Sequence, residues 1–298
     1  MATIYTYAES NTRRTWVYLT FLFLFIIGLG WFFSYLLNSQ GILIVAVIFS
    51  ILMSFGSYWY SDKIVLAMSG ARPIKKEDSL ELYRVIENLC ITAGLPLPKI
   101  YILNEAQPNA FATGRDANHA VVAVTRGLLE KLDKTELEGV MAHELSHIGN
   151  KDILLSTVIV ILVGMVTIIS DLFFRMSFWG GRDRDRNSAG AILVLLGIVA
   201  AILAPIAATL IQLAISRKRE FLADASGVLL TRYPEGLARA LEKIAKDPAP
   251  LRAANNSTAH LYIENPFRGK KSQNWLTNLF MTHPSVEDRI RALRGMEV

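Results

Sequence analysis

Cysteine is almost absent from this chain, since Cys90 is the only one among its 298 residues. A single thiol cannot form a disulfide within the chain, and it cannot supply the cysteine cluster that many structural zinc sites use. The lack of a disulfide framework fits a soluble part that faces a reducing compartment. Any metal site must therefore be built from histidine and carboxylate side chains.

Basic blocks interleaved with aromatic residues are also absent, although the net charge is +5 and the pI is about 9.3. This pattern indicates positive loops at a membrane surface and excludes nucleic acid as the predicted partner. Hydrophobic residues make up 52% of the chain, and the mean hydropathy is +0.34. Such values predict membrane spans, with the lipid bilayer as a partner.

Two long uncharged runs near the N-terminus predict a transmembrane helical hairpin. They extend from Trp16 to Leu37 and from Gly41 to Tyr60, and each is long enough to cross a bilayer. Arg13-Arg14 precede the hairpin and Lys63 follows it. By the positive-inside rule, both of its open ends are expected in the cytoplasm.

A signal peptide is the alternative reading of the first run, because basic residues precede it. The apolar part is too long for one, and Asn38-Ser39-Gln40 offers no small-x-small cleavage site. The first run is therefore interpreted as a retained anchor.

Between residues 71 and 149 the composition is that of a globular domain. Apolar spacing predicts a helix from Leu80 to Cys90 that stops at Gly94. Lys99 to Leu103 and His119 to Thr125 are predicted strands. An exposed edge of such a small sheet can hold an extended peptide by main-chain hydrogen bonds.

A second hydrophobic hairpin is predicted from the apolar runs at 153–170 and 189–215. Its Arg-containing loop at 182–186 would lie outside the cell if the metal site is cytoplasmic, against the positive-inside preference. Whether this hairpin spans the bilayer is therefore left open. The predicted organisation is an N-terminal transmembrane hairpin (1–62), the first part of a peptidase domain (63–152), the second hairpin (153–215) and the second part of the domain (216–298).

The segment His143-Glu144-Leu145-Ser146-His147 carries the clearest chemical signal. Asp133, with Glu136 three residues later, predicts a helix start upstream of it. On that helix His143 and His147 lie one turn apart on one face, where both can bind one metal ion. Glu144 lies beside them and can accept a proton from water, which is the H-E-x-x-H arrangement of zinc hydrolases.

A catalytic zinc site needs a third protein ligand and an open position for water. Glu220 is the candidate. The H-E-x-x-H helix directly precedes the second hairpin and the charged segment of Glu220 directly follows it, so both are expected at the open end of that hairpin. Asp224 is four residues on, so it shares a helix face with Glu220 and can hold a ligand imidazole. The alternative is an ordinary solvated run that ends a membrane helix.

The other histidines are rivals for the third ligand. His119 and His260 are more typical of structural or surface positions. His283 lies in a loop before a final helix, where it could cap the helix or donate a hydrogen bond to the transition state.

Taken together, the chain resembles the HtpX-type membrane zinc endopeptidases, relatives of the CAAX prenyl proteases, over nearly its whole length. The motifs that carry the resemblance are 109–114, His143-Glu144-Leu145-Ser146-His147, 220–224 and His283-Pro284 with Arg289. The resemblance implies one zinc ion per chain, bound by His143, His147 and Glu220, with Glu144 catalytic. It implies that Asn109 lies by the substrate and that His283 and Arg289 lie near the site, where Arg289 could pair with Asp224.

The resemblance also implies a multi-pass protein of the bacterial plasma membrane, with a cytoplasmic active site that degrades damaged membrane proteins. The predicted fold class is α+β: a mainly helical integral membrane metallopeptidase with a small sheet beside the H-E-x-x-H helix. The predicted reaction is peptide hydrolysis by zinc-activated water, with Glu144 as general base. The alternatives are a non-enzymatic membrane protein with a structural zinc site and a transporter or metal sensor. Oligomeric state is not predicted.

Overall fold

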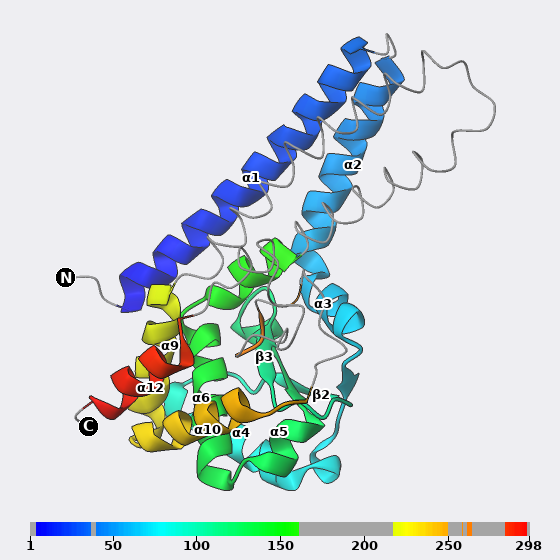
Figure 1. Cartoon of the computed structure of the whole chain (residues 1–298). Helices are drawn as coiled ribbons and strands as arrows, with labels where there is room; N and C mark the ends of the chain where they lie inside the picture. Colours follow the sequence, from blue (N-terminus) through cyan, green and yellow to red (C-terminus); the bar gives the residue numbers. More distant parts are fainter. Residues whose placement is uncertain are drawn as a thin grey trace.

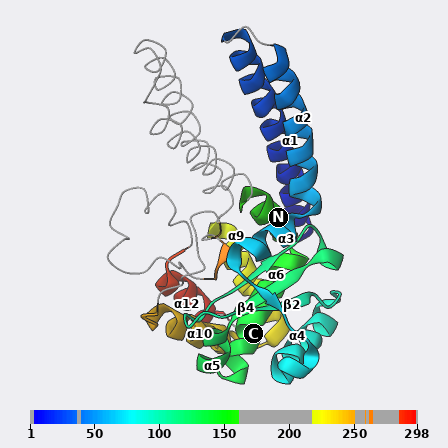
Figure 2. The same cartoon turned by 90° about the vertical axis from the view of Figure 1, so that its right-hand side faces the viewer.

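Helices α1 (Ile4–Leu36) and α2 (Gln40–Trp59) form a hairpin that projects from a body built around helix α6 (Lys134–Gly149; Figures 1 and 2). The computed structural model describes residues 4–36, 40–160, 217–249, 258, 261–263 and 284–296. The other elements are α3 (Ser61–Ser69), β1 (Arg72–Pro73), η1 (Lys76–Asp78), α4 (Leu80–Ala93), β2 (Lys99–Leu103), β3 (Ala110–Thr113), η2 (Ala117–His119), β4 (Val121–Thr125), α5 (Arg126–Lys131), α9 (Arg217–Thr231), α10 (Pro234–Lys246) and α12 (Val286–Arg294).

Helix α6 begins where the sequence predicted it. The Asp133 side chain accepts the backbone N–H of Glu136, and the Glu136 carboxylate accepts the backbone N–H of Asp133. This reciprocal capping satisfies two N–H groups that the first turn leaves without a helical partner. The helix is buried along most of its length, including the polar His143 and Glu144. It therefore holds its polar groups inside the body rather than on a solvated face.

The four described strands form one sheet in the order β1-β2-β4-β3. Strands β2 and β4 are parallel, whereas β3 runs antiparallel to β4 with Ala112 opposite Val122. All five residues of β4 are buried, as expected for a β-branched central strand. Strand β3 is therefore an edge strand, and it contacts α6.

Glycines allow two helices to approach α6 closely. A Cβ at Gly139 would lie 2.6 Å from the backbone nitrogen of Leu237, so α10 can cross α6 only because that Cβ is missing. A Cβ at Gly227 would lie 3.1 Å from the backbone nitrogen of His143. The second contact brings α9, and with it Glu220, onto the histidine helix.

Large apolar side chains remain exposed along the hairpin, among them Trp31, Leu52 and Phe55. Within the described part of the chain, no helix combines the length and the apolar character needed to cross a membrane. The predicted second hairpin at 153–215 lies outside the described residues from position 161 onward.

Several predicted elements are confirmed, and others need correction. Helix α4 ends at Gly94, whose φ of 65° is the left-handed conformation that favours glycine. The second predicted strand begins at Val121 rather than His119, because Asp116 caps a short 3-10 turn that ends at His119. Helix α1 begins at Ile4, well before the apolar run, and strands β1 and β3 were not predicted.

Candidate metal centre

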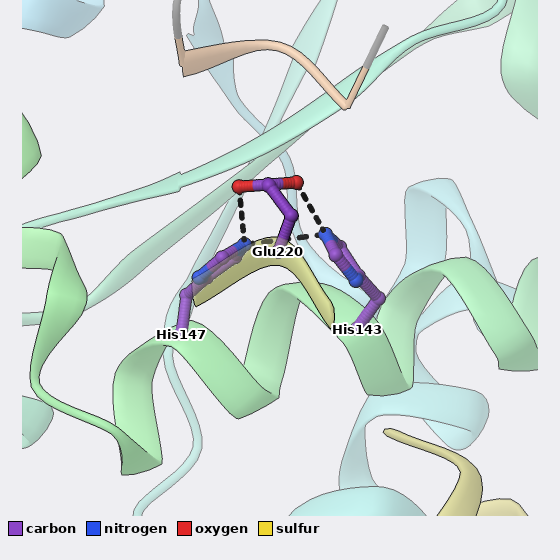
Figure 3. Close-up of side chains that lie close together, drawn as sticks. All are labelled: His143, His147 and Glu220. Carbon is purple, nitrogen blue, oxygen red and sulfur yellow. Dashed lines mark hydrogen bonds and ion pairs between the residues drawn. The ribbon is translucent and has the colours of Figure 1, made fainter. Parts of the chain in front are cut away.

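The side chains of His143, His147 and Glu220 converge between α6 and α9 (Figure 3). The two Nε2 atoms lie 3.2 Å apart. The Glu220 carboxylate faces both, with Oε2 at 3.7 Å from Nε2 of His143 and Oε1 at 3.8 Å from Nε2 of His147. The structure thus brings together the three predicted metal ligands.

The spacing of these atoms fits a zinc ion. Two ligand atoms that are each about 2 Å from a tetrahedral zinc lie roughly 3.3 Å apart. The nitrogen and oxygen atoms here are separated by 3.2 to 3.8 Å. Two imidazoles and one carboxylate are also a ligand set that catalytic zinc uses while keeping one position open. The residues present therefore suit a metal ion, and zinc in particular.

His143 is oriented by a buried ion pair from the C-terminal part of the chain. Its Nδ1 lies 2.8 Å from Asp224 Oδ1 on α9. Arg289 of α12 donates to both oxygens of Asp224, at 2.9 and 2.6 Å, which confirms the predicted pairing. Arg289 also donates to the carbonyl oxygen of Ile263 at 3.1 Å. With Nδ1 directed at a carboxylate, Nε2 of His143 points to the metal position.

His147 has an equivalent support that the sequence reasoning missed. Its Nδ1 lies 3.1 Å from Oδ2 of Asp152, which is buried just beyond the end of α6. In the predicted domain organisation, Asp152 is only the last residue before the second hairpin. The position of Asp152 in the sequence could have indicated this role. A carboxylate five residues after a predicted ligand histidine can reach its ring if the chain turns between them.

Glu144 is buried against the edge strand of the sheet. Glu144 is 2% exposed, and the nearby backbone N–H of Ala112 on β3 acts to lower its pKa. Burial raises the pKa of Glu144 to about 7, against the lowering effect of His147 and with a further raising effect of Glu220. A carboxyl group with this pKa can both accept and return a proton near neutral pH.

The two imidazoles differ in their acidity. Burial lowers the pKa of His143, and the nearby Arg289 cation lowers it further against the opposing effect of Asp224. Burial also acts to lower the pKa of His147, but the Asp152 hydrogen bond and the Glu220 charge raise it to about 9. Only the neutral imidazole binds a metal, so His143 is already in the binding form at neutral pH.

The other predicted site residues lie in different surroundings, and two of the histidines fall outside the described residues. Asn109 is buried at the start of β3, where Thr125 donates to its carbonyl oxygen and accepts its N–H. His283 and the rival His260 lie outside the described residues. The rival His119 is exposed and pairs with Asp116 at 2.7 Å, away from the three converging ligands.

The chain is similar to proteins of one peptidase family. The family model described as "Peptidase family M48" matches residues 76–297. A "Protease HtpX homolog" of Caldanaerobacter subterraneus subsp. tengcongensis is 44% identical over 302 residues, which cover 99% of each chain. Another, from Dictyoglomus thermophilum, is 47% identical over 99% of this chain and 95% of its own.

A solved structure titled "Crystal Structure of S. mikatae Ste24p" is 20% identical, with a TM-score of 0.48. The similarity covers 92% of this chain and 62% of that chain.

Proposed function

The chain belongs to peptidase family M48 and is a metalloprotease, and we propose that it is a membrane-bound zinc endopeptidase with one zinc ion per chain. His143, His147 and Glu220 are the proposed ligands. The observation that carries this assignment is the convergence of their three ligand atoms, with each imidazole backed by a carboxylate at Nδ1. Zinc, when bound, supplies a Lewis acid that acidifies water and polarises a carbonyl group.

Glu144 is the proposed general base. Its carboxylate lies on the helix turn that carries both histidines and is buried from bulk water. It accepts the proton of the attacking water and later delivers that proton to the leaving amine. The raised pKa of Glu144, about 7, supports this double role because the carboxylate can hold the proton between the two steps.

The proposed substrate is an extended segment of a protein that lies along β3. Strand β3 is a sheet edge that contacts α6, and the backbone N–H of Ala112 on it acts to lower the pKa of Glu144. An edge strand can bind such a peptide through main-chain hydrogen bonds. Asn109 and His283 are proposed to lie by the substrate, with Asn109 held in place by Thr125. Asp224 and Arg289 are proposed to hold His143, and Arg289 also lies 3.7 Å from Oε2 of Glu220.

The hairpin is proposed to lie in a bacterial plasma membrane, with the site on the cytoplasmic side and damaged membrane proteins as substrates. Support comes from apolar side chains that remain more than half exposed, such as Trp31 at 61%, Leu52 at 65% and Phe55 at 63%. An apolar surface of this kind is rare on proteins that face water alone. Trp59 and Tyr60 at the base of α2 are typical of a membrane interface.

The decisive experiment compares the full chain in detergent, loaded with zinc, with its Glu144→Gln variant on an unfolded protein substrate. The Glu138→Gln variant, a carboxyl-to-amide change on the same helix, is the matched control. Zinc content is measured for all three by elemental analysis. We expect equal zinc in all, cleavage by the unaltered chain and by Glu138→Gln, and no turnover by Glu144→Gln. Cleavage by Glu144→Gln would refute the base assignment. If all three proteins bind zinc and none of them cleaves the substrate, a structural zinc site would be favoured.

A further inference from the structure

The turn after α6 has an unusual backbone. The helix ends at Gly149, Lys151 adopts a φ of 56°, and the chain is helical again from residue 152. A left-handed conformation is uncommon for a residue other than glycine, because Cβ crowds the following carbonyl group. Such a turn persists when contacts around it hold it in place.

Asn11, near the start of helix α1, contacts this turn on both sides of Lys151. Its side-chain Nδ2 donates to the carbonyl oxygen of Asn150 at 3.2 Å and to Oδ1 of Asp152. The sequence separations are 139 and 141 residues. Asn11 is 2% exposed, and Figure 1 shows the N-terminal end of its helix, α1, lying at the body. One amide group thus joins the two halves of the turn.

The contact continues to the metal ligand. Asp152 receives Asn11 on Oδ1 and faces Nδ1 of His147 with Oδ2, at 3.1 Å. Because the Asp152 side chain is 4% exposed, water has little access to replace either partner. The hydrogen bond from Asn11 to Oδ1 limits rotation of the Asp152 carboxylate. Oδ2 therefore stays directed at Nδ1 of the His147 ring.

We infer that Asn11 is a positioning residue of the metal centre, acting through Asp152 on the ring of His147. This inference rests on the proposed zinc site. It makes the N-terminal helix part of the site, although none of the proposed ligands lies before residue 143. A simpler role, in which Asn11 only fastens α1 to the body, would affect folding but not the affinity for zinc.

The test is a double-mutant cycle on the full chain in detergent: the unaltered protein, Asn11→Asp, Asp152→Asn and the double variant. Asn11→Asp keeps the shape of the side chain but replaces the donor Nδ2 by a carboxylate oxygen, which faces the Asn150 carbonyl oxygen and Oδ1 of Asp152. In the double variant the amide introduced at position 152 again offers a donor to position 11. The zinc Kd is measured by competition with a chelator, and thermal unfolding of the zinc-free proteins reports folding.

We expect Asn11→Asp to raise the zinc Kd by about tenfold or more, the size of loss typical for partners of metal ligands. Asp152→Asn is expected to raise it only a few-fold, since its amide oxygen can still accept from His147. The double variant should bind zinc more tightly than Asn11→Asp alone, because the two positions are coupled. Asn11→Ala, which adds no charge, serves if Asn11→Asp does not fold, with an expected loss of about tenfold.

Two control variants test whether a loss of zinc affinity is specific to position 11. Asn88→Asp makes the same change at an exposed position of α4, and Val17→Ala alters an exposed side chain of α1. Both are expected to keep the zinc Kd of the unaltered chain. An unchanged Kd in Asn11→Asp and Asn11→Ala, or losses that simply add in the double variant, would overturn the inference. Failure of the unaltered chain to bind zinc would instead count against the proposed metal site.

Discussion

The two halves of the metal centre are built differently. His143 is 1% exposed and is backed by the charged pair of Asp224 and Arg289, which come from α9 and α12. The His147 side chain is 17% exposed and is backed by Asp152 and, through it, by the neutral amide of Asn11 on α1. One histidine thus depends on the C-terminal part of the chain and the other on the N-terminal helix.

The difference shows in the acidity of the rings. Burial and then the Arg289 cation favour the neutral form of His143, whereas at His147 the carboxylates of Asp152 and Glu220 outweigh burial and favour the charged form. One motif on one helix thus holds two histidines in different environments. The changes that follow test how far the two halves differ.

Removal of Arg289 is expected to have the largest effect. Arg289→Met leaves Asp224 buried without its cation, and breaking a buried pair in this way typically costs about 3–5 kcal/mol. The free energy of unfolding of the full chain in detergent, from denaturant titration, should fall by that amount, and zinc binding should weaken. Arg291→Met is the control, since the Arg291 side chain is 80% exposed on the same helix. A loss below about 1 kcal/mol, the range of an exposed ion pair, would contradict this account.

The carboxylates behind the two histidines are expected to differ in importance. Asp224→Asn removes a charge that compensates Arg289 and that holds a fully buried ring, so a rise in zinc Kd of about 10–100-fold is expected. Asp152→Asn should cause a rise of only a few-fold, because His147 is more exposed and the amide can still accept its N–H. Chelator competition gives both values. Equal losses would show that the two halves are equivalent.

The pH dependence of zinc binding should report His147 rather than His143. The pKa of His147 is raised from 6.5 to about 9 in the folded, zinc-free chain, so zinc must displace a proton from it at pH 7.5. Affinity should therefore rise by about tenfold per pH unit toward pH 9. The stability that this proton adds to the zinc-free fold is complete below 6.5 and is lost as the pH rises through about 9.

The Asp152→Asn variant serves as the comparison, because it removes a negative charge that raises the pKa of His147. Its rise in affinity should shift to lower pH. Superimposable profiles for the two proteins would rule out this explanation.

Two glycines test the packing of the helix that carries both histidines. Gly227→Ala places a Cβ 3.1 Å from the backbone nitrogen of His143, so α9 must shift, at a cost of about 1–3 kcal/mol. At Gly149, near the His147 end of α6, the nearest atom to a new Cβ is a Leu95 methyl group at 4.0 Å. Gly149→Ala should instead be neutral or stabilise the chain by about 0.4–1 kcal/mol. Thermal unfolding distinguishes the two, and destabilisation by both would show that the α6–α9 contact is not special.

Much of the site was predictable because it depends on local spacing. The capping pair Asp133 and Glu136 and the four-residue spacing of the histidines required only helical geometry. The pairing of Asp224 with Arg289 was predictable from the resemblance, since neither charge could remain buried alone.

Strand β3 and the contacts of Asp152 were not predictable. The four residues of β3 are small or aromatic and show no alternation of apolar and polar side chains that would indicate a strand. Their pairing with β4 is set by the register across the sheet. Asn11 lies in a polar segment without apolar periodicity, and its partners are about 140 residues away. The backbone of Lys151, which directs Asp152 toward the ring, has no sequence signal comparable to a glycine.

By itself the sequence determined the helix that carries both histidines and its capping, because these depend on the spacing of residues within a few turns of helix. The resemblance of four motifs along the chain indicated the peptidase family and Glu220 as the third predicted ligand. The tertiary structure alone decided that the two histidines have different supports and that a residue of α1 reaches one of them. The reason is physical: hydrogen bonds between distant segments form only after packing has excluded water and set the distance between them.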